Sequence, residues 1–143
     1  MIAAHRDAVQ ARLEARFPGK VFDTARLDPD GEFVRDNYLI LFAGSPVETG
    51  GDRQVYAQVV DDNAVFDYTV RVVATSASVA LDMLDAVHIE LLGWTPTIPG
   101  RRCQRLHYPR QNPRVQTENS VKPPLFWVDT EWVLRSNFVA GGS

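Results

Sequence analysis

The residues of this chain that could do chemistry are few and widely separated. Cys103 and His107 stand four positions apart in RRCQRLHY, a spacing that would place a thiol and an imidazole on the same face of a strand. Their Cα atoms would lie roughly 13 Å apart at about 3.3 Å per residue, which is too far for a hydrogen bond within one strand. A zinc site needs three or four ligands, and His5 and His88 are the remaining histidines. We therefore expect a half-buried cysteine and a surface histidine, with no metal site and no cofactor.

Adjacent carboxylates at Asp61 and Asp62 are the other candidate for acid–base chemistry. They belong to an Asp-Asp-Asn turn, where exposure to water would leave neither pKa raised as acid catalysis requires. Gly50 and Gly51 lack the context of a phosphate loop, and no Gly-x-Ser-x-Gly or His-Glu-x-x-His motif is present. The basic segments GRRCQR and HYPR are typical of a guarded sheet edge, with DNA phosphates as an alternative ligand. The sequence therefore does not predict an enzyme.

The composition is that of an ordinary globular domain. Of the 143 residues, 45% are hydrophobic and 23% are charged, and this length suits a single domain, residues 1–143, with one core. The net charge of −3 is a poor match for a nucleic-acid-binding surface, which is normally basic. The single cysteine excludes an internal disulfide bond. No segment approaches the roughly 20 apolar residues that a membrane-spanning helix needs.

Hydrophobic periodicity predicts an N-terminal helix followed by several strands. Ile2, Val9, Leu13 and Phe17 recur near helical spacing, and Pro18-Gly19 ends the helix. The segment NYLILFA is apolar on both faces and should be a central strand covered on both sides. Asp61-Asp62-Asn63 should join residues 53–60 to the next strand in a β-hairpin that ends at residue 74. Further strands are expected in KVFDT (20–24), RRCQRLHY (101–108) and LFWVDTEWVLRSNF (125–138).

The stretch FDYTVRVVATSASVALDMLDAVHIELLGW changes from strand periodicity to helical periodicity at residues 74–76. The strand has one apolar face and one polar face, and Thr75, Ser76 or Ser78 can cap the helix that follows. Gly93 ends that helix, whose core stripe is Ala80, Leu84, Val87 and Leu91. The fold class is therefore α/β, more closely α+β, a mostly antiparallel sheet with two main helices on one face. A β-hairpin, a long proline-rich arm (109–124) and a flexible C-terminal end (139–143) complete it.

Some apolar residues fall outside this predicted core. Ile89 lies near the acidic side of the helix, Trp94 follows its end, and Trp127 lies on the polar face of the last strand. Tryptophan is favoured at protein–protein contacts because it buries a large area at little entropy cost. A thick core with a few exposed residues is the alternative. The interface expected from this pattern comprises Ile89, Trp94, Arg114, Val115, Trp127, Glu131 and Arg135.

The order of these segments resembles that of the tail terminator proteins of long-tailed bacteriophages, also called tail completion or minor tail proteins, especially those of actinobacteriophages. The shared order is an N-terminal helix, KVFDT, NYLILF, a strand, small-polar joint and helix in YTVRVVATSASVALDMLDAVHIELLG, and then RCQRL, PRVQTENSV and PPLFWVDTEWVLRS. None of these segments is a catalytic motif. The likeness is one of order and spacing across nearly the whole chain.

The resemblance implies a virion protein of the tail or neck, assembled in the host cytoplasm. Copies of the chain would form a homohexameric ring that caps the tail tube, ends its polymerisation and offers a docking face for the head connector. The partners would be the tail tube protein and the head–tail connector, and DNA would pass through the lumen without specific binding. Asp61 and Asp62 are expected to face that lumen, since acidic walls would not hold passing DNA.

Two alternative functions remain open from the sequence. One is a head–tail connector, or stopper, protein of the neck, which would bind the head-side adaptor in place of the tube. The other is a monomeric small-ligand-binding or enzymatic α+β domain, whose pocket would involve Cys103, His107 and the arm. Self-association would favour an assembly protein, and a ligand-responsive monomer would favour the second alternative.

Overall fold

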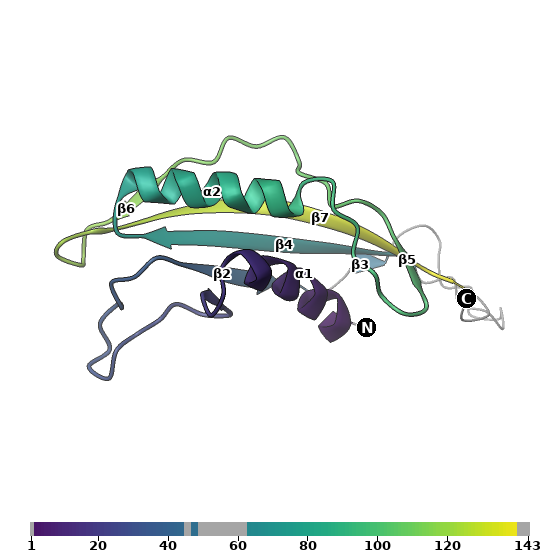
Figure 1. The fold of residues 1–143 in the computed structure, drawn as a ribbon, viewed down its shortest axis with the longest axis horizontal. Coiled ribbons are helices and arrows are strands. Elements are labelled where there is room, and N and C mark those ends of the chain that lie inside the picture. Colours follow the sequence, from purple (N-terminus) through teal and green to yellow (C-terminus); the bar gives the residue numbers. More distant parts are fainter. Residues whose placement is uncertain (1, 45–46, 49–62, 140–143) are drawn as a thin grey trace.

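The computed structural model describes residues 2–44, 47–48 and 63–139 (Figure 1). Two helices, α1 (Ile2–Arg16) and α2 (Ala77–Leu91), accompany a single sheet in this part of the chain. Its strand order is β1-β2-β4-β7-β5, with β3 paired to β4 and β6 paired to β7. The only parallel pair among them is β1 with β2. The strands are β1 (Val21–Phe22), β2 (Tyr38–Ala43), β3 (Val47–Glu48), β4 (Asn63–Ala74), β5 (Arg101–Cys103), β6 (Gln116–Glu118) and β7 (Leu125–Phe138).

Both helices cover the same face of the sheet, which confirms the predicted α+β fold. Val9 and Leu13 of α1 join Leu84 and Val87 of α2 in one core cluster with the inward residues of β2, β4 and β7. Figure 1 shows α2 lying along β4 and β7. None of the helices in the described part is long and apolar enough to cross a membrane.

The strand-to-helix unit forms as its sequence predicts. Ser76 is the N-cap of α2, and its hydroxyl accepts a hydrogen bond from the Val79 amide at 3.2 Å. Gly93 follows the helix with φ +74°, a conformation that costs glycine little. The whole predicted core stripe is buried: Ala80, Leu84, Val87 and Leu91.

The prediction for the apolar stripe of α1 is wrong at one position. Ile2 is 47% exposed, whereas His5 is fully buried one turn before Val9. The His5 ring stacks on the Phe66 ring, with the two ring centroids 4.1 Å apart, and His5 Nε2 lies 2.7 Å from Ser136 Oγ. A polar partner and an aromatic neighbour thus let a histidine take the buried position that the sequence pattern assigns to an aliphatic residue.

The predicted central strand, β2, is covered on both sides over its first four residues, whereas Phe42 and Ala43 are exposed. Leu39 and Leu41 face the helices, whereas Tyr38 and Ile40 contribute to a second, smaller cluster on the opposite face. That second cluster also contains Val73 and Leu125, with Phe22, Val121 and Trp127 packed against it.

Strands β4 and β7 form the long centre of the sheet. Their antiparallel register runs from Asn63↔Asn137 to Ala74↔Phe126. The predicted alternation is confirmed, because Tyr68 and Trp132 face the core while Arg71 and Asp129 lie on the opposite face. The first strand of the predicted hairpin (53–60) and residues 140–143 of the C-terminal end lie outside the described residues.

The strand predicted over residues 101–108 is shorter than expected. Strand β5 ends at Cys103. Isolated pairings continue beyond it, since Gln104 donates its N–H to the Arg135 carbonyl at 2.9 Å and His107 forms a bridge with Val133. Single-residue pairings do not require the strict alternation from which a strand is predicted.

Candidate functional site

The segment that follows β5 lies along the outer edge of β7. Beyond the His107 bridge, the Gln111 side chain bonds both backbone groups of Glu131, donating to its carbonyl and accepting from its amide, each at 2.9 Å. Strand β6 then pairs with β7 from Gln116↔Trp127 to Glu118↔Leu125. The arm expected at residues 109–124 therefore lies against its own sheet over part of its length (Figure 1). Its role at an interface remains a prediction.

A hollow opens beside this segment, and we call it the arginine hollow. It has a volume of about 470 Å³ and is lined by Gln104, Arg105, His107, Val133 and Arg135. The side chains of Arg105, His107 and Arg135 are exposed. The predicted interface residue Arg135 of β7 therefore lies beside Arg105, which belongs to the segment that follows β5.

The face of the sheet away from the helices, here the open face, carries a charged pair. Arg71 donates to both carboxylate oxygens of Asp129, at 2.7 and 3.0 Å. These hydrogen bonds raise the pKa of Arg71. The Arg71 guanidinium also lies over the Trp127 ring, 4.4 Å from its centroid. Next to this pair, Thr69 donates to the Glu131 carboxylate at 2.9 Å.

Trp127 and Glu131 thus lie on the polar face of β7, as predicted, but neither is free. Trp127 is half-buried against the second cluster and beneath Arg71. It borders an apolar hollow of about 140 Å³ on the open face. The lining of this hollow is Ala25, Phe33, Tyr38, Ile40, Arg71, Val73, Glu118, Leu125 and Trp127.

The outer side of α2 is an exposed apolar surface. Ile89 is 73% exposed, and Leu81 and Leu92 are more than half exposed. Trp94, by contrast, packs partly against the core with the Arg12 guanidinium 5.4 Å from its ring centroid. Its prediction as material outside the core is therefore only partly right, because α1 covers it. Along the β6 side, Arg114 is exposed, whereas Val115 packs against the core.

A projecting turn at residues 27–33, here the acidic turn, was not predicted to have a function. The Asp28 carboxylate accepts hydrogen bonds from the amides of Asp30 and Glu32, at 2.9 and 3.0 Å. Leu27 and Phe33 form a bridge across it and are both exposed. Figure 1 shows the segment extending beyond the end of the sheet where β2 begins. Apolar residues on both sides of Asp-Pro-Asp-Gly-Glu were the available sequence signal.

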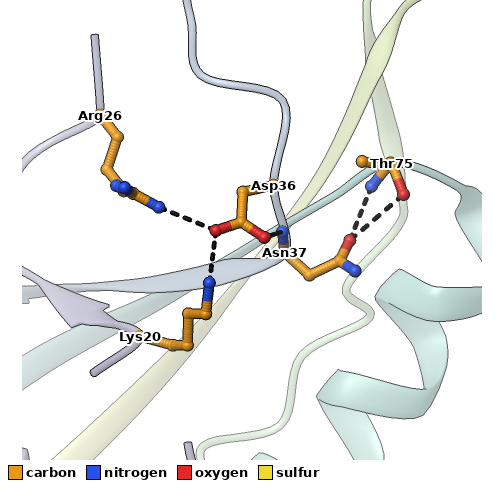
Figure 2. A network of polar contacts seen from close by, with 5 residues as sticks. All are labelled: Lys20, Arg26, Asp36, Asn37 and Thr75. Carbon is orange, nitrogen blue, oxygen red and sulfur yellow. Dashed lines mark hydrogen bonds and ion pairs between the residues drawn. The ribbon is translucent and has the colours of Figure 1, made fainter. Parts of the chain in front are cut away.

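The base of this projection is fixed by a polar network (Figure 2). The Asp36 carboxylate lies 2.5 Å from Lys20 Nζ and 2.8 Å from Arg26 Nη1. The hydrogen bond from Lys20 is the main cause that lowers the pKa of Asp36. Beside it, the Asn37 side-chain oxygen accepts from the Thr75 amide at 2.9 Å. The network therefore ties the end of the turn segment to β1 and to the start of α2.

Cys103 and His107, the described residues that suggested chemistry, lie in different surroundings. Cys103 packs partly against the core, its thiol 3.7 Å from Ser136 Oγ, and burial raises the pKa of that thiol. A raised pKa disfavours the nucleophilic thiolate. His107 is exposed at the edge, as predicted. Asp61 and Asp62 lie outside the described residues, and among those described no cluster of metal-ligating side chains occurs.

Comparison with known proteins identifies a shared fold. A solved structure entitled "Virion of native gene transfer agent (GTA) particle" contains a chain that matches this one with a TM-score of 0.63 and 19% sequence identity. The match covers 94% of this chain and 96% of that chain. At this identity the likeness concerns the fold. Neither a family model nor a curated protein sequence matches the chain.

Proposed function

We propose that this protein is a structural component of a phage-type virion. The observation that carries the proposal is the fold shared with a chain of the gene transfer agent virion, which extends over nearly the whole length of both chains. The segment order noted in the sequence supports the same assignment independently of the coordinates. On this proposal the protein is not an enzyme and is located in the virion.

Within the virion, the proposed role is that of a tail terminator. A homohexameric ring of this chain caps the tail tube, ends its polymerisation and presents a docking face to the head connector. The outer side of α2 supports a role in assembly, because its leucine and isoleucine side chains are exposed in the subunit. Exposed apolar surface of this kind is typical of protein–protein contacts. The open face around Trp127 and the β6 side around Arg114 and Val115 are the further proposed contact surfaces.

Electron microscopy of particles assembled without this protein tests the role directly. Overlong, uncapped tail tubes are the expected result. Tails of normal length that fail to join heads would instead assign the protein to the head–tail connector. Normal particles in its absence would contradict both roles.

Two substitutions test the contact surfaces. Ile89→Ser should leave the urea midpoint nearly unchanged, because the side chain is 73% exposed, but should reduce the amount of ring on the tube. Trp127→Ala should leave the subunit folded and also weaken ring formation. Circular dichroism during urea unfolding measures the stability of each variant, and negative-stain microscopy of capped tubes measures ring formation. Global unfolding of the Trp127 variant would show that the second cluster depends on that ring.

The proposed lumen residues need a separate measurement. Replacement of Asp61 and Asp62 by lysine should slow or arrest DNA passage through the ring, because lysine binds phosphate. Unaltered DNA delivery by particles carrying Asp61→Lys and Asp62→Lys would count against their placement in the channel.

A further inference from the structure

The chain carries an acidic projection at one end of the sheet and a basic hollow toward the other end. The acidic turn adjoins β2, whose first residue, Tyr38, pairs with Val73 near the end of β4. The arginine hollow lies beside Val133 and Arg135, which pair with the opposite half of β4. The two features are therefore separated along the long axis of the molecule (Figure 1).

The acidic turn has its shape before any partner binds. The Asp28 side chain holds the amides of Asp30 and Glu32, while Gly31 supplies the positive φ of +82° that closes the turn. Because these residues are already ordered, docking the turn costs little further conformational entropy. The carboxylates of Asp30 and Glu32 remain exposed.

The cations near the base of the acidic turn do not neutralise its tip. Arg26 pairs with Asp36, and Arg35 donates to the Pro123 carbonyl. The tip therefore presents its negative charge outward, away from the body of the subunit.

The arginine hollow has the opposite charge. Arg105 and Arg135 are exposed, and neither forms an ion pair within the described residues. Two carboxylates, Asp67 opposite Val133 and Glu131 two residues before it, lie at neighbouring positions of the same face but do not line the hollow. The lining itself contains two arginines and no carboxylate, and it is therefore positive.

We propose that the acidic turn of one copy docks into the arginine hollow of the next copy. Arginine and carboxylate form strong charge-assisted hydrogen bonds, which here would join Asp30 and Glu32 to Arg105 and Arg135. Leu27 and Phe33 would then be covered at the margin. The proposal rests on the proposed function, in which copies of this chain contact one another.

The arrangement has a consequence for symmetry. A contact between two different surfaces of the same chain is head-to-tail, so that each copy offers one free turn and one free hollow. Such contacts build closed rings or open helices, not isolated two-fold dimers. Side-by-side contact between two acidic turns would instead be repulsive.

Charge reversal tests the contact. The hollow variant carries Arg105→Glu and Arg135→Glu, and the turn variant carries Asp30→Arg and Glu32→Arg. Each alone should lose assembly at concentrations where the wild type forms multiples of 16.0 kDa in native mass spectrometry. An equimolar mixture should regain assemblies in which the two variants alternate, because each opposite-charge contact is restored. Assembly by either variant alone, or no recovery on mixing, overturns the proposal.

A disulfide trap tests the same contact even if the rings form weakly away from the tube. In a Cys103→Ala background, Asp30→Cys with Arg105→Cys should give a ladder of covalent multimers under mild oxidation. The control pair Asp7→Cys with Arg105→Cys, which uses an exposed α1 carboxylate in place of the turn, should give no ladder. Absence of the ladder with the Asp30 pair contradicts the inference.

The outcomes separate the inference from the function on which it rests. Capped tubes that form normally with the charge-reversed variants would refute the docking contact and leave the tail-terminator role standing. Tails that are normal without the protein would refute the role itself. Binding of labelled double-stranded DNA to the protein can be measured by fluorescence anisotropy. If the DNA binds and the substitutions Arg105→Glu and Arg135→Glu abolish that binding, the hollow is a nucleic-acid site and docking by a second copy is overturned.

Discussion

Replacement of Thr130 by valine is the most informative single change to the core. Thr130 lies on the helix-facing side of β7 and is fully buried beside Trp132. The Trp132 indole Nε1 donates to Thr130 Oγ1 at 2.9 Å, and that hydroxyl donates to the Val70 carbonyl at 3.3 Å. Valine has nearly the same shape and favours strands equally well. A calculation from hydrophobicity alone would therefore predict that Thr130→Val stabilises the protein.

The hydrogen bonds predict the opposite sign. Without the hydroxyl, the buried Trp132 N–H loses its acceptor, which costs about 1–3 kcal/mol. The added methyl group recovers up to about 0.8 kcal/mol through burial. With the full recovery, Thr130→Val should therefore reduce the free energy of unfolding by about 0.2–2 kcal/mol. For a chain of this size, the upper end corresponds to a decrease in Tm of roughly 4–8 °C.

Urea unfolding followed by circular dichroism measures this difference without relying on tryptophan fluorescence. The dependence on urea concentration should be unchanged, because the same surface is exposed on unfolding. The control is Thr130→Val combined with Trp132→Phe, which removes donor and acceptor together. The double variant should lose less unfolding free energy than the sum of the losses of Thr130→Val and Trp132→Phe measured separately, by about 1 kcal/mol. A stabilising Thr130→Val, or no coupling between the two changes in the double variant, would refute the assignment of this hydrogen bond as a determinant of stability.

Three further changes test the core and the polar network. Leu84→Ala should cost about 2–5 kcal/mol, as truncations of buried leucine do, whereas Leu81→Ala on the exposed side of the same helix should cost under about 1 kcal/mol, both by urea titration. Tyr68→Phe should stabilise the protein by roughly 1 kcal/mol, because the buried Tyr68 hydroxyl has no hydrogen-bond partner in the described structure; destabilisation in the same assay would show that it has one. Asp36 has its pKa lowered below the ordinary value of 3.8, so its stabilisation is present above that pH and is lost as the pH falls through the folded-state value. The free energy of unfolding of Asp36→Asn should therefore be lower than that of the wild type near neutral pH, and the two values should converge at low pH. A difference that does not change with pH would contradict the ion-pair assignment.

Strict periodicity made the centre of the fold predictable. In β4 and β7 every second residue faces the core over twelve paired positions. A shift of one residue in the pairing would turn these apolar side chains to the other face, so the pattern determines which face is buried. The cap at Ser76 and the glycine after α2 are likewise local signals. His5 was not predictable in this way, because its partner Ser136 lies 131 positions away in the sequence.

The covering of the β7 edge escaped prediction for a related reason. Proline lacks the N–H that a strand ladder needs, so the segment 109–124 has the composition of a loop. Yet a side-chain amide replaces backbone pairing at Gln111, and β6 needs only three residues. Neither device has a periodic signature.

The candidate surfaces were predictable only in part. Trp127, Glu131 and Arg135 could be placed on one face of a strand from their spacing, and the structure places them there. That Arg71 covers Trp127 could not be inferred, because it depends on the β4–β7 register. The opposite charges of the acidic turn and the arginine hollow are visible in the sequence, but their separation along the molecule comes from the strand order.

The segment that lines β7 also determines what kinds of association this subunit can avoid. An uncovered fourteen-residue strand would be a template onto which any unfolded chain could add its own backbone. Here the pairings from β5 through His107 and Gln111 to β6 satisfy that template internally. At the positions paired in this way, β7 offers no free backbone groups to a second chain.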